Sequence, residues 1–357
     1  MPIAAVPTPA AAETPPPAPV VATPQAVQPS SPPSPQASCT RTFAGDPSGG
    51  TDVSDALQDF VDETPDGSVL CLAAGATYRV DARISISRRS NLTVDGRGAR
   101  LRSPVARNEA FISVNEGSGI VLRNLVIEGA NAAAGTTGAL DRDLQHGHAF
   151  ALEAVRSVLI ESNTVRRIFG DFVYVGTNSS LVWSDGVTVR DNDFALNGRM
   201  GVAVVAGRNI VVTANSFDKV GMFTLDIEPN AYSPPTGGDN IEFSGNWVGS
   251  GTHTNLYSPL FFGALGSGNT TNVRILNNTL AGQGLRIWVD PMEDHYVRRS
   301  FTISGNVSSV SITGPAMRFT DVAGVTVTNN TQPLSSGQLV TTSGSTDVTV
   351  SGNSTAR

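Results

Sequence analysis

Two carboxylates stand two residues apart in "FTLDIEPN" (223–230), a stretch that we expect to form a β-strand. Apolar Leu225 and Ile227 alternate with the two acids, which is typical of a strand with one buried face. Asp226 and Glu228 would then leave the same face of the strand, with Cα atoms about 6.5 to 7 Å apart. Their mutual repulsion would raise the pKa of one carboxyl and leave a protonated acid beside an ionised base.

Glycoside hydrolysis needs this division of labour, so Asp226 and Glu228 are the candidate catalytic pair. The separation expected between the carboxyls falls between the ranges for retaining glycosidases, about 5 to 5.5 Å, and inverting ones, about 6.5 to 9.5 Å. Asp171 is a reserve acid two coils away. This mechanism requires no cofactor, and the sequence predicts no bound metal for it.

The same residues fit other functions. In β-elimination, or C5 epimerisation of a uronan, Asp226 and Glu228 would bind Ca²⁺, and Arg199 or Tyr174 would remove the C5 proton. A non-catalytic carbohydrate-binding or adhesive protein, or a phage-type depolymerase, is a further alternative. In a non-catalytic protein the two acids would be solvated charges before the turn at Pro229.

A repeat indicates what positions these groups. Short alternating strands are each followed by an asparagine, 23 to 32 residues after the last, at Asn163, Asn192, Asn215, Asn246, Asn278, Asn306, Asn330 and Asn353. Asparagine tolerates the left-handed conformation of a tight bend, and stacked amides can hydrogen-bond from coil to coil. Coils of about 23 residues with loop insertions and no helix between strands predict an all-β, single-stranded parallel β-helix.

One amphipathic helix is expected at the start of the solenoid. Residues 51–62, "TDVSDALQDFVD", carry an apolar stripe at helical spacing, with Thr51 as a plausible N-cap. This helix would cap the open N-terminal end of the β-helix.

The segments "GDPSGGTDVSDALQDFVD", "SVLCLAAGATYRV" and "NLTVDGRGARL" resemble the N-terminal part of the pectin-lyase-like β-helix superfamily. The resemblance covers roughly residues 43–357 and identifies no specific family. It implies a right-handed β-helix with a carbohydrate-facing groove along one sheet. The superfamily includes glycoside hydrolases, lyases, epimerases, esterases and tailspikes, so the resemblance is weak for activity.

The strand after each asparagine turn supplies the candidate substrate-binding residues. Aligning these strands by their apolar pairs makes Ala149 and Ala151 inward, and places aromatic and charged residues outward near the acids. The candidates are Arg199, His148, Tyr174, Arg286, Trp288, Phe150 and Phe261. Aromatic rings beside carboxylates suit a sugar, whose C–H face stacks on rings while its hydroxyls bond polar groups. Trp183 and Trp247 are expected to serve packing.

Composition limits the partners. The chain of 357 residues has a net charge of −7, which argues against nucleic acid, and no apolar run of about 18 residues that could span a membrane. A polysaccharide is the expected partner, and nothing indicates an oligomeric state.

Residues 1–38 hold 12 of the 22 prolines and are expected to be a disordered Pro/Ala-rich linker, followed by one β-helix domain over residues 39–357. Cys39 and Cys71, the two cysteines of the chain, are expected to pair as a disulfide. Linker and disulfide together predict a secreted or cell-surface bacterial protein, although the start lacks the pattern of a signal peptide.

Overall fold

The computed structural model describes residues 38–180, 182–230, 236–251, 262–264, 268–290 and 296–356. The chain divides into two units, Met1–Pro33 and Ser34–Arg357, and all described residues belong to the second. The expected linker lies outside the described residues except for residue 38, so its boundaries stay a prediction. No helix among the described residues is long and apolar enough to cross a membrane.

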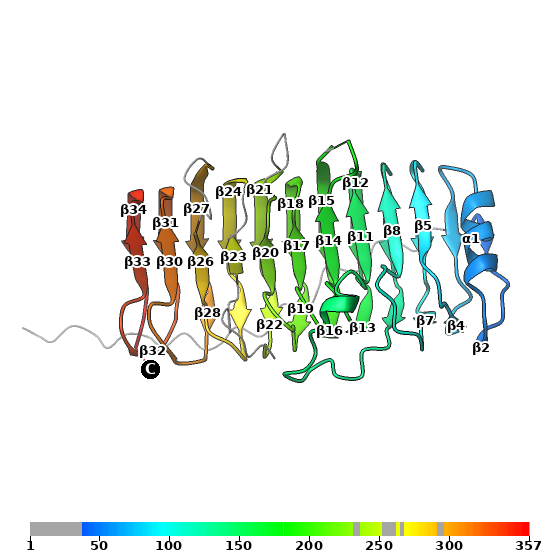
Figure 1. Ribbon diagram of the computed structural model, residues 1–357, viewed down its shortest axis with the longest axis horizontal. Helices are drawn as coiled ribbons and strands as arrows, with labels where there is room; N and C mark the ends of the chain where they lie inside the picture. Colours follow the sequence, from blue (N-terminus) through cyan, green and yellow to red (C-terminus); the bar gives the residue numbers. More distant parts are fainter. Residues whose placement is uncertain are drawn as a thin grey trace, which may run out of the picture. The chain divides into compact units, whose positions relative to one another are not determined.

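The second unit is a right-handed parallel β-helix, as expected, with strands stacked in three long parallel sheets (Figure 1). Sheet A contains β1 (Arg41–Thr42), β3 (Val69–Cys71), β6 (Thr93–Asp95), β9 (Val121–Arg123), β12 (Arg156–Glu161), β15 (Ser184–Arg190), β18 (Gly207–Thr213), β21 (Gly237–Ser244), β24 (Asn269–Leu276), β27 (Arg298–Ser304), β31 (Ala323–Thr328) and β34 (Thr346–Ser351). Sheet B contains β2 (Ser48–Asp52), β4 (Thr77–Arg79), β7 (Arg100–Arg102), β10 (Val126–Glu128), β13 (Thr164–Ile168), β16 (Asp193–Asn197), β19 (Ser216–Asp218), β22 (Trp247–Val248), β25 (Thr279–Leu280) and β28 (Val307–Ser308).

Sheet C carries the candidate site. It contains β5 (Ile84–Ser87), β8 (Ile112–Asn115), β11 (Phe150–Glu153), β14 (Val173–Gly176), β17 (Val202–Val204), β20 (Leu225–Ile227), β23 (Phe262–Ala264), β26 (Ile287–Val289), β30 (Met317–Thr320) and β33 (Val340–Ser343). Two short strands, β29 (Ile312–Thr313) and β32 (Leu334–Ser336), form a separate pair, and Arg142–Leu144 form a 3₁₀ turn.

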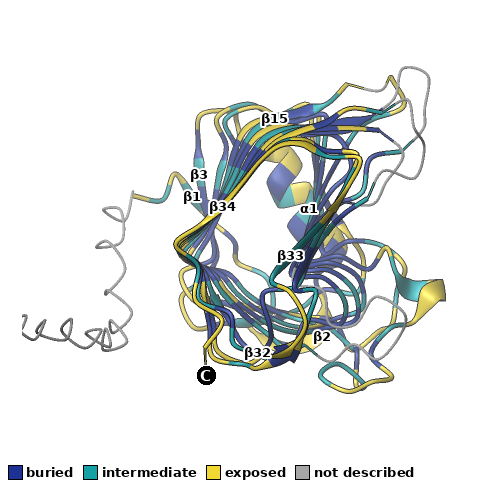
Figure 2. Cartoon of the chain, turned by 90° about the vertical axis from the view of Figure 1, so that its left-hand side faces the viewer, coloured by how far each residue is buried: buried dark blue, intermediate teal, exposed yellow. Residues whose placement is uncertain are grey.

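The inner faces of the three sheets enclose one continuous apolar core, seen as buried strands around the axis in Figure 2. Alternation along each strand turns every second side chain inward, so stacked coils place like side chains on top of one another. Phe194 and Phe217 stack in this way in sheet B, with ring centroids 5.3 Å apart. Across the core, Phe172 packs against Phe194 and Phe243 against Phe217, with centroids 5.1 and 5.7 Å apart. Such contacts add about 0.5–1.5 kcal/mol each to the burial of the rings.

The asparagine column forms a buried hydrogen-bonded ladder from Asn163 to Asn353, which confirms the predicted stacking of amides. The Asn215 Oδ1, for example, accepts from the backbone N–H of Asn192 at 3.0 Å and from its Nδ2 at 2.9 Å. The Asn215 Nδ2 in turn donates to the Val189 carbonyl at 2.9 Å. Each amide therefore joins neighbouring coils and satisfies backbone groups that the bend leaves unpaired.

The expectation that the asparagines themselves take the left-handed conformation is wrong. The residue before each ladder asparagine has the positive φ, for example Asp191 at 56° and Ala214 at 55°. The bend at this preceding residue turns the asparagine side chain into the stack, where its amide meets the next coil.

The capping helix α1 spans Ser54–Glu63, at the N-terminal end of the solenoid in Figure 1. It buries Leu57 and Val61 against the first coil. The N-cap is Val53 and not Thr51, because Thr51 belongs to β2, which pairs with β4. The strand continues to Asp52, two residues into the range expected to be helical.

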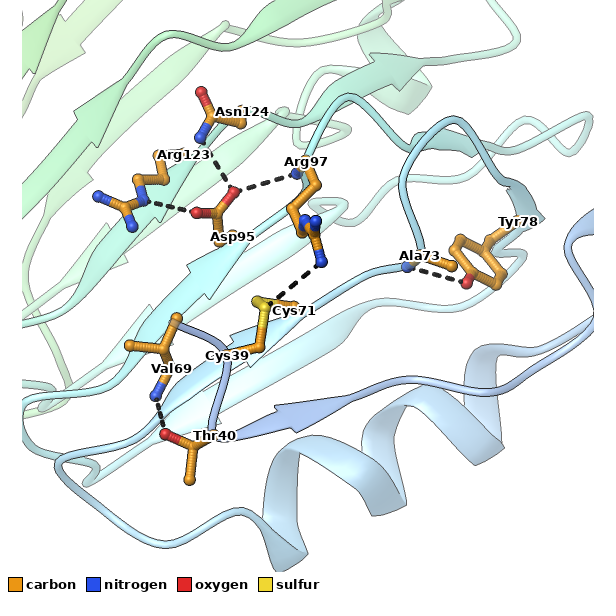
Figure 3. The surroundings of a disulfide bond; sticks show 10 residues. All are labelled: Cys39, Thr40, Val69, Cys71, Ala73, Tyr78, Asp95, Arg97, Arg123 and Asn124. Carbon is orange, nitrogen blue, oxygen red and sulfur yellow. Dashed lines mark hydrogen bonds and ion pairs between the residues drawn. A yellow bond between two sulfur atoms is a disulfide. The ribbon is translucent and has the colours of Figure 1, made fainter. Parts of the chain in front are cut away.

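The predicted disulfide is present. Cys39, just before β1, is bonded to Cys71 in β3, and their Cα atoms are 5.7 Å apart (Figure 3). Arg97 lies beside it, with Nη1 3.6 Å from the Cys39 sulfur. The bond ties the start of the domain to its first complete coil.

Removing an interior rung of the ladder is predicted to cost more than removing its end. Asn215→Ala leaves the buried N–H of Asn192 without an acceptor, so we expect a loss of about 2 kcal/mol or more in the free energy of unfolding. Asn353→Ala, at the half-exposed last rung, should cost less than half as much because water can replace its bonds. Denaturant titrations of both variants test this, and equal losses would contradict a ladder role.

Candidate functional site

The register of sheet C aligns one outward-facing position on consecutive coils. From β5 to β30 this row is Ser85, Ser113, Ala151, Tyr174, Ala203, Asp226, Gly263, Trp288 and Arg318. Asp226 therefore faces outward between Ala203 and Gly263, two coils from Tyr174. The small neighbours give its side chain space above the sheet, as the sequence suggested.

Three candidate positions differ from the expected alignment. Phe150 is fully buried and faces the core, whereas Ala151 faces outward, so the prediction that Phe150 contacts a substrate is wrong. In "HAFALEAV" both alternating sets are apolar, so the pattern did not fix which set points inward. Trp288 lies in the row of Asp226 and not in that of Glu228. Arg286 lies just before β26, and its Nη2 donates to the Thr313 carbonyl at 3.0 Å. Phe261 lies outside the described residues.

Arg199 joins two acids, which come from the coils before and after its own. Its Nη1 lies 2.8 Å from Asp171 Oδ2, and its Nη2 lies 2.7 Å from Glu228 Oε2. Asp171 is fully buried, and its Oδ1 accepts from the Met200 backbone N–H at 2.9 Å. The charge of Asp171 raises the pKa of Arg199, with smaller contributions from Glu228 and Asp226 and with burial opposing. Asp171 thus holds the guanidinium in place and is closed to solvent in this structure.

Asp226 faces outward but is 3% exposed. A small apolar cluster of Met200, Ala203 and Phe223 lies on this outer face, with Tyr174, Met222 and Trp288 packed around it. Burial raises the pKa of Asp226 well above the usual range, the charge of Glu228 raises it further, and Arg199 opposes both. The site therefore favours a protonated Asp226 beside a Glu228 carboxylate that pairs with Arg199.

Glu228 lies close enough to contribute to this pKa shift mainly through its charge, with hydrogen bonding the smallest cause. The separation expected between the two carboxyls, between the ranges of retaining and inverting glycosidases, stays a prediction. The Glu228 side chain is 44% exposed and lies past the end of β20, so it is the partner that is free to separate.

His148 and Tyr174 form the neighbouring wall. The His148 Nδ1 accepts from the Asp171 backbone N–H at 3.0 Å, and its ring stacks on Tyr174 with centroids 5.0 Å apart and planes 12° apart. Burial lowers the pKa of His148 to about 4, although the charge of Asp171 opposes the shift. The imidazole is therefore neutral at pH 7 and carries its proton on Nε2.

A groove of about 490 Å³ runs from this wall over the outer face of β5, β8, β11 and β14. Its lining includes Ser85, Asn115, Glu153, His148 and Tyr174. Asn115 Nδ2 donates to Glu153 Oε2 at 3.3 Å, and burial raises the pKa of the Glu153 carboxyl. Sequence reasoning missed Asn115 and Glu153, although both occupy outward positions two residues beyond the row of Asp226.

The described residues contain no group of three His, Cys, Asp or Glu side chains that could hold a metal ion. A guanidinium already occupies the position between Asp171 and Glu228 that a cation would take.

No protein-family model and no curated protein sequence matches the chain. Its fold is similar to solved structures of low identity. ORF18 of Geobacillus virus E2 has a TM-score of 0.58 at 13% identity over 85% of this chain, and the chain spans 58% of that protein's length. An alginate lyase from Paenibacillus sp. strain FPU-7 has a TM-score of 0.56 at 14% identity, covering 88% of this chain and 100% of the lyase.

The adhesin PfbA of Streptococcus pneumoniae has a TM-score of 0.51 at 12% identity, covering 87% of this chain and 97% of the adhesin. The resemblance to right-handed parallel β-helix proteins is thus confirmed at the level of the fold, and no specific family follows from it.

His148 is predicted to make the protein sensitive to acid. Its pKa is about 4 when folded and 6.5 as the ordinary value, so the unfolded state binds the proton first as the pH falls. This stability is present above pH 6.5 and is lost between pH 6.5 and 4, by about 3 kcal/mol. His148→Gln, which keeps an acceptor for the Asp171 N–H, should flatten this part of the stability profile.

His146→Gln is the matched control in the same loop, since His146 is exposed. Unfolding free energies measured from pH 7 to 4 should keep most of their slope in this variant, because the charge of His146 is the smallest cause of the His148 shift. An unchanged slope in His148→Gln would show that other groups cause the acid sensitivity.

Proposed function

We propose that the chain hydrolyses glycosidic bonds of a polysaccharide bound along the outer face of sheet C. The observation that carries the proposal is the buried Asp226, whose raised pKa favours the protonated form beside the Glu228–Arg199 ion pair. A carboxylic acid whose pKa is raised by burial and by a neighbouring carboxylate is the general acid that this reaction needs. The groove that reaches the site at Tyr174 offers hydroxyl, amide and aromatic groups to a sugar chain.

In this mechanism Asp226 gives its proton to the glycosidic oxygen as the C–O bond breaks. Glu228 takes a proton from the water that attacks the anomeric carbon. Proton transfer from Glu228 to Asp226, directly or through a water molecule, then restores the starting state, and the net reaction adds one water across the bond. Substrate must separate the two carboxyls for this, and Arg199 would hold Glu228 away from Asp226 as it does so.

Elimination is the second candidate, favoured by the stack of Tyr174 on a neutral His148 at the end of the groove. Arg199 suits the neutralisation of a uronate, but the charge of Asp171 raises its pKa and makes it a poor base. Tyr174 would therefore remove the C5 proton, in a lyase or an epimerase. A non-catalytic binding role remains the third alternative, since PfbA, an adhesin, shares the fold.

A location outside the cytoplasm goes with this function. Its support is the Cys39–Cys71 disulfide, a bond that persists in oxidising compartments. Polysaccharide substrates of exported enzymes are found there.

The test is a panel of neutral and uronate-containing polysaccharides, read for new reducing ends and for the ultraviolet absorbance of a new C=C bond. We expect reducing ends without absorbance. Asp226→Asn and Glu228→Gln should each lower the rate by about 10²-fold to 10⁴-fold, because each removes a proton-transfer group. Asp193→Asn, an outward acid of sheet B paired with Arg166, is the matched control and should keep full activity.

The outcomes separate the alternatives. Ultraviolet absorbance of a new C=C bond that is lost in Tyr174→Phe would show that the reaction is elimination and not hydrolysis. Full activity in both Asp226→Asn and Glu228→Gln would remove the carboxyl pair from the reaction. If neither reducing ends nor absorbance appear while the protein still binds a polysaccharide, an epimerase or an adhesive protein would be favoured.

A further inference from the structure

A second hollow lies at the corner where the coils pass from sheet C into sheet A. It has a volume of about 320 Å³, within the usual size range of small-ligand sites. The lining residues are Trp183, Arg208, Gly238, Asp239, Asn269, Thr271, Val297 and Arg299, which come from five successive coils. None of them lines the groove on sheet C. We call this hollow the corner cleft.

The indole of Trp183 lies along the solenoid axis on a floor without bulky side chains. Trp183, Ala206 and Gly237 directly precede residues that pair in register, so they follow one another from coil to coil. A Cβ placed on Gly237 would lie 2.7 Å from the indole Cη2, and Ala206 between them is fully buried. The ring thus reaches across two coils, and only glycine at 237 leaves it room to lie there.

Polar groups of opposite charge border this ring. Arg208, Asp239, Thr271 and Arg299 occupy one outward row on the first residues of sheet A strands. Asp239 Oδ1 accepts from Asn272 Nδ2 at 2.8 Å and from the Thr271 hydroxyl. Arg208 pairs with Asp185 at 2.9 Å, whereas Arg299 is exposed and has Thr271 and Ala323 beside it in register.

Two exposed valines lie near the cleft. Val182 directly precedes Trp183 and is 41% exposed, and Val297 lines the cleft just before β27 and is 44% exposed. Packing alone does not explain why a half-buried indole shares this corner with exposed valines, a carboxylate and a guanidinium.

We propose that the corner cleft is a second glycan-binding site, in which a pyranose ring stacks on Trp183. The apolar C–H face of a sugar matches an indole, and Asp239 and Arg299 are placed to accept from and donate to its hydroxyl groups. Such a site would hold a polysaccharide chain to the protein at a place distinct from the Asp226 cluster. It goes beyond the proposed reaction, because binding here does not depend on how Asp226 acts.

Affinity electrophoresis tests this in the Asp226→Asn background, which prevents cleavage of the ligand. The gels contain starch, xylan, galactomannan or β-glucan as neutral polysaccharides, and alginate, polygalacturonate or carrageenan as acidic ones. We expect at least one to retard the protein, and Trp183→Ala to weaken that binding about tenfold. Arg299→Ala, at an exposed position that cannot disturb the fold, should weaken it less. Trp247→Ala, which removes a half-buried indole from sheet B, is the matched control and should change nothing.

Each result decides for or against the site. If Trp183→Ala loses the binding of a neutral polysaccharide, stacking on the indole is supported. If Trp183→Ala and Arg299→Ala both lose the binding of an acidic polysaccharide, the site is supported with Arg299 as an anion contact. Retardation that survives Trp183→Ala but is lost in Tyr174→Ala places the ligand in the sheet C groove and overturns the proposal. Absence of retardation by every polysaccharide overturns it as well, whereas loss of catalysis in Asp226→Asn bears only on the proposed reaction.

Discussion

Stacking of each coil on the next is the constraint on which the whole structure depends. Parallel backbone pairing and the ladder from Asn163 to Asn353 hold successive coils in one register, and that register decides which side chains share a row. A slip by one residue would exchange the inner and outer faces of a strand. Asp226 lies outward beside Ala203 and Gly263 only because the coils before and after it are fixed.

The site uses this order to bring charges together that are far apart in sequence. Asp171, Arg199 and Glu228 come from three coils, and one guanidinium joins the two acids. Asp226 and Glu228 differ in their exposure to water. Apolar neighbours exclude water from Asp226, whereas Glu228 is half exposed. Two carboxyls two residues apart thus acquire different proton affinities from their surroundings, which is how one site provides an acid and a base. The corner cleft also depends on the stacking of coils, since its floor and its polar row come from successive coils.

Much of the fold could be predicted because its signals repeat. The asparagine column, the alternating strands and the amphipathic stripe of α1 each reflect a local physical need, and the two cysteines left one intramolecular pairing. The register of sheet C was harder. Where one alternating set is polar, as at Tyr174 and Asp226, the predicted orientation agrees with the structure. Where both sets are apolar, as around Phe150, it does not, because burial alone cannot choose between them. The contact of Asp226 with Glu228 and the burial of Asp171 depend on side-chain packing between coils, which spacing along one strand does not contain.

The proton on Asp226 is the central claim, and its ionisation is the measurement that tests it most directly. Carboxyl ¹³C resonances of the protein labelled at Asp and Glu can be followed from pH 4 to 9, with Asp226→Asn to assign the signal. The account predicts one carboxyl that titrates well above the ordinary range of aspartate and is missing from the variant, because burial and the charge of Glu228 raise the pKa of Asp226. An Asp226 signal that titrates near pH 4, the ordinary range of aspartate, would contradict it and remove the general acid from the proposed reaction.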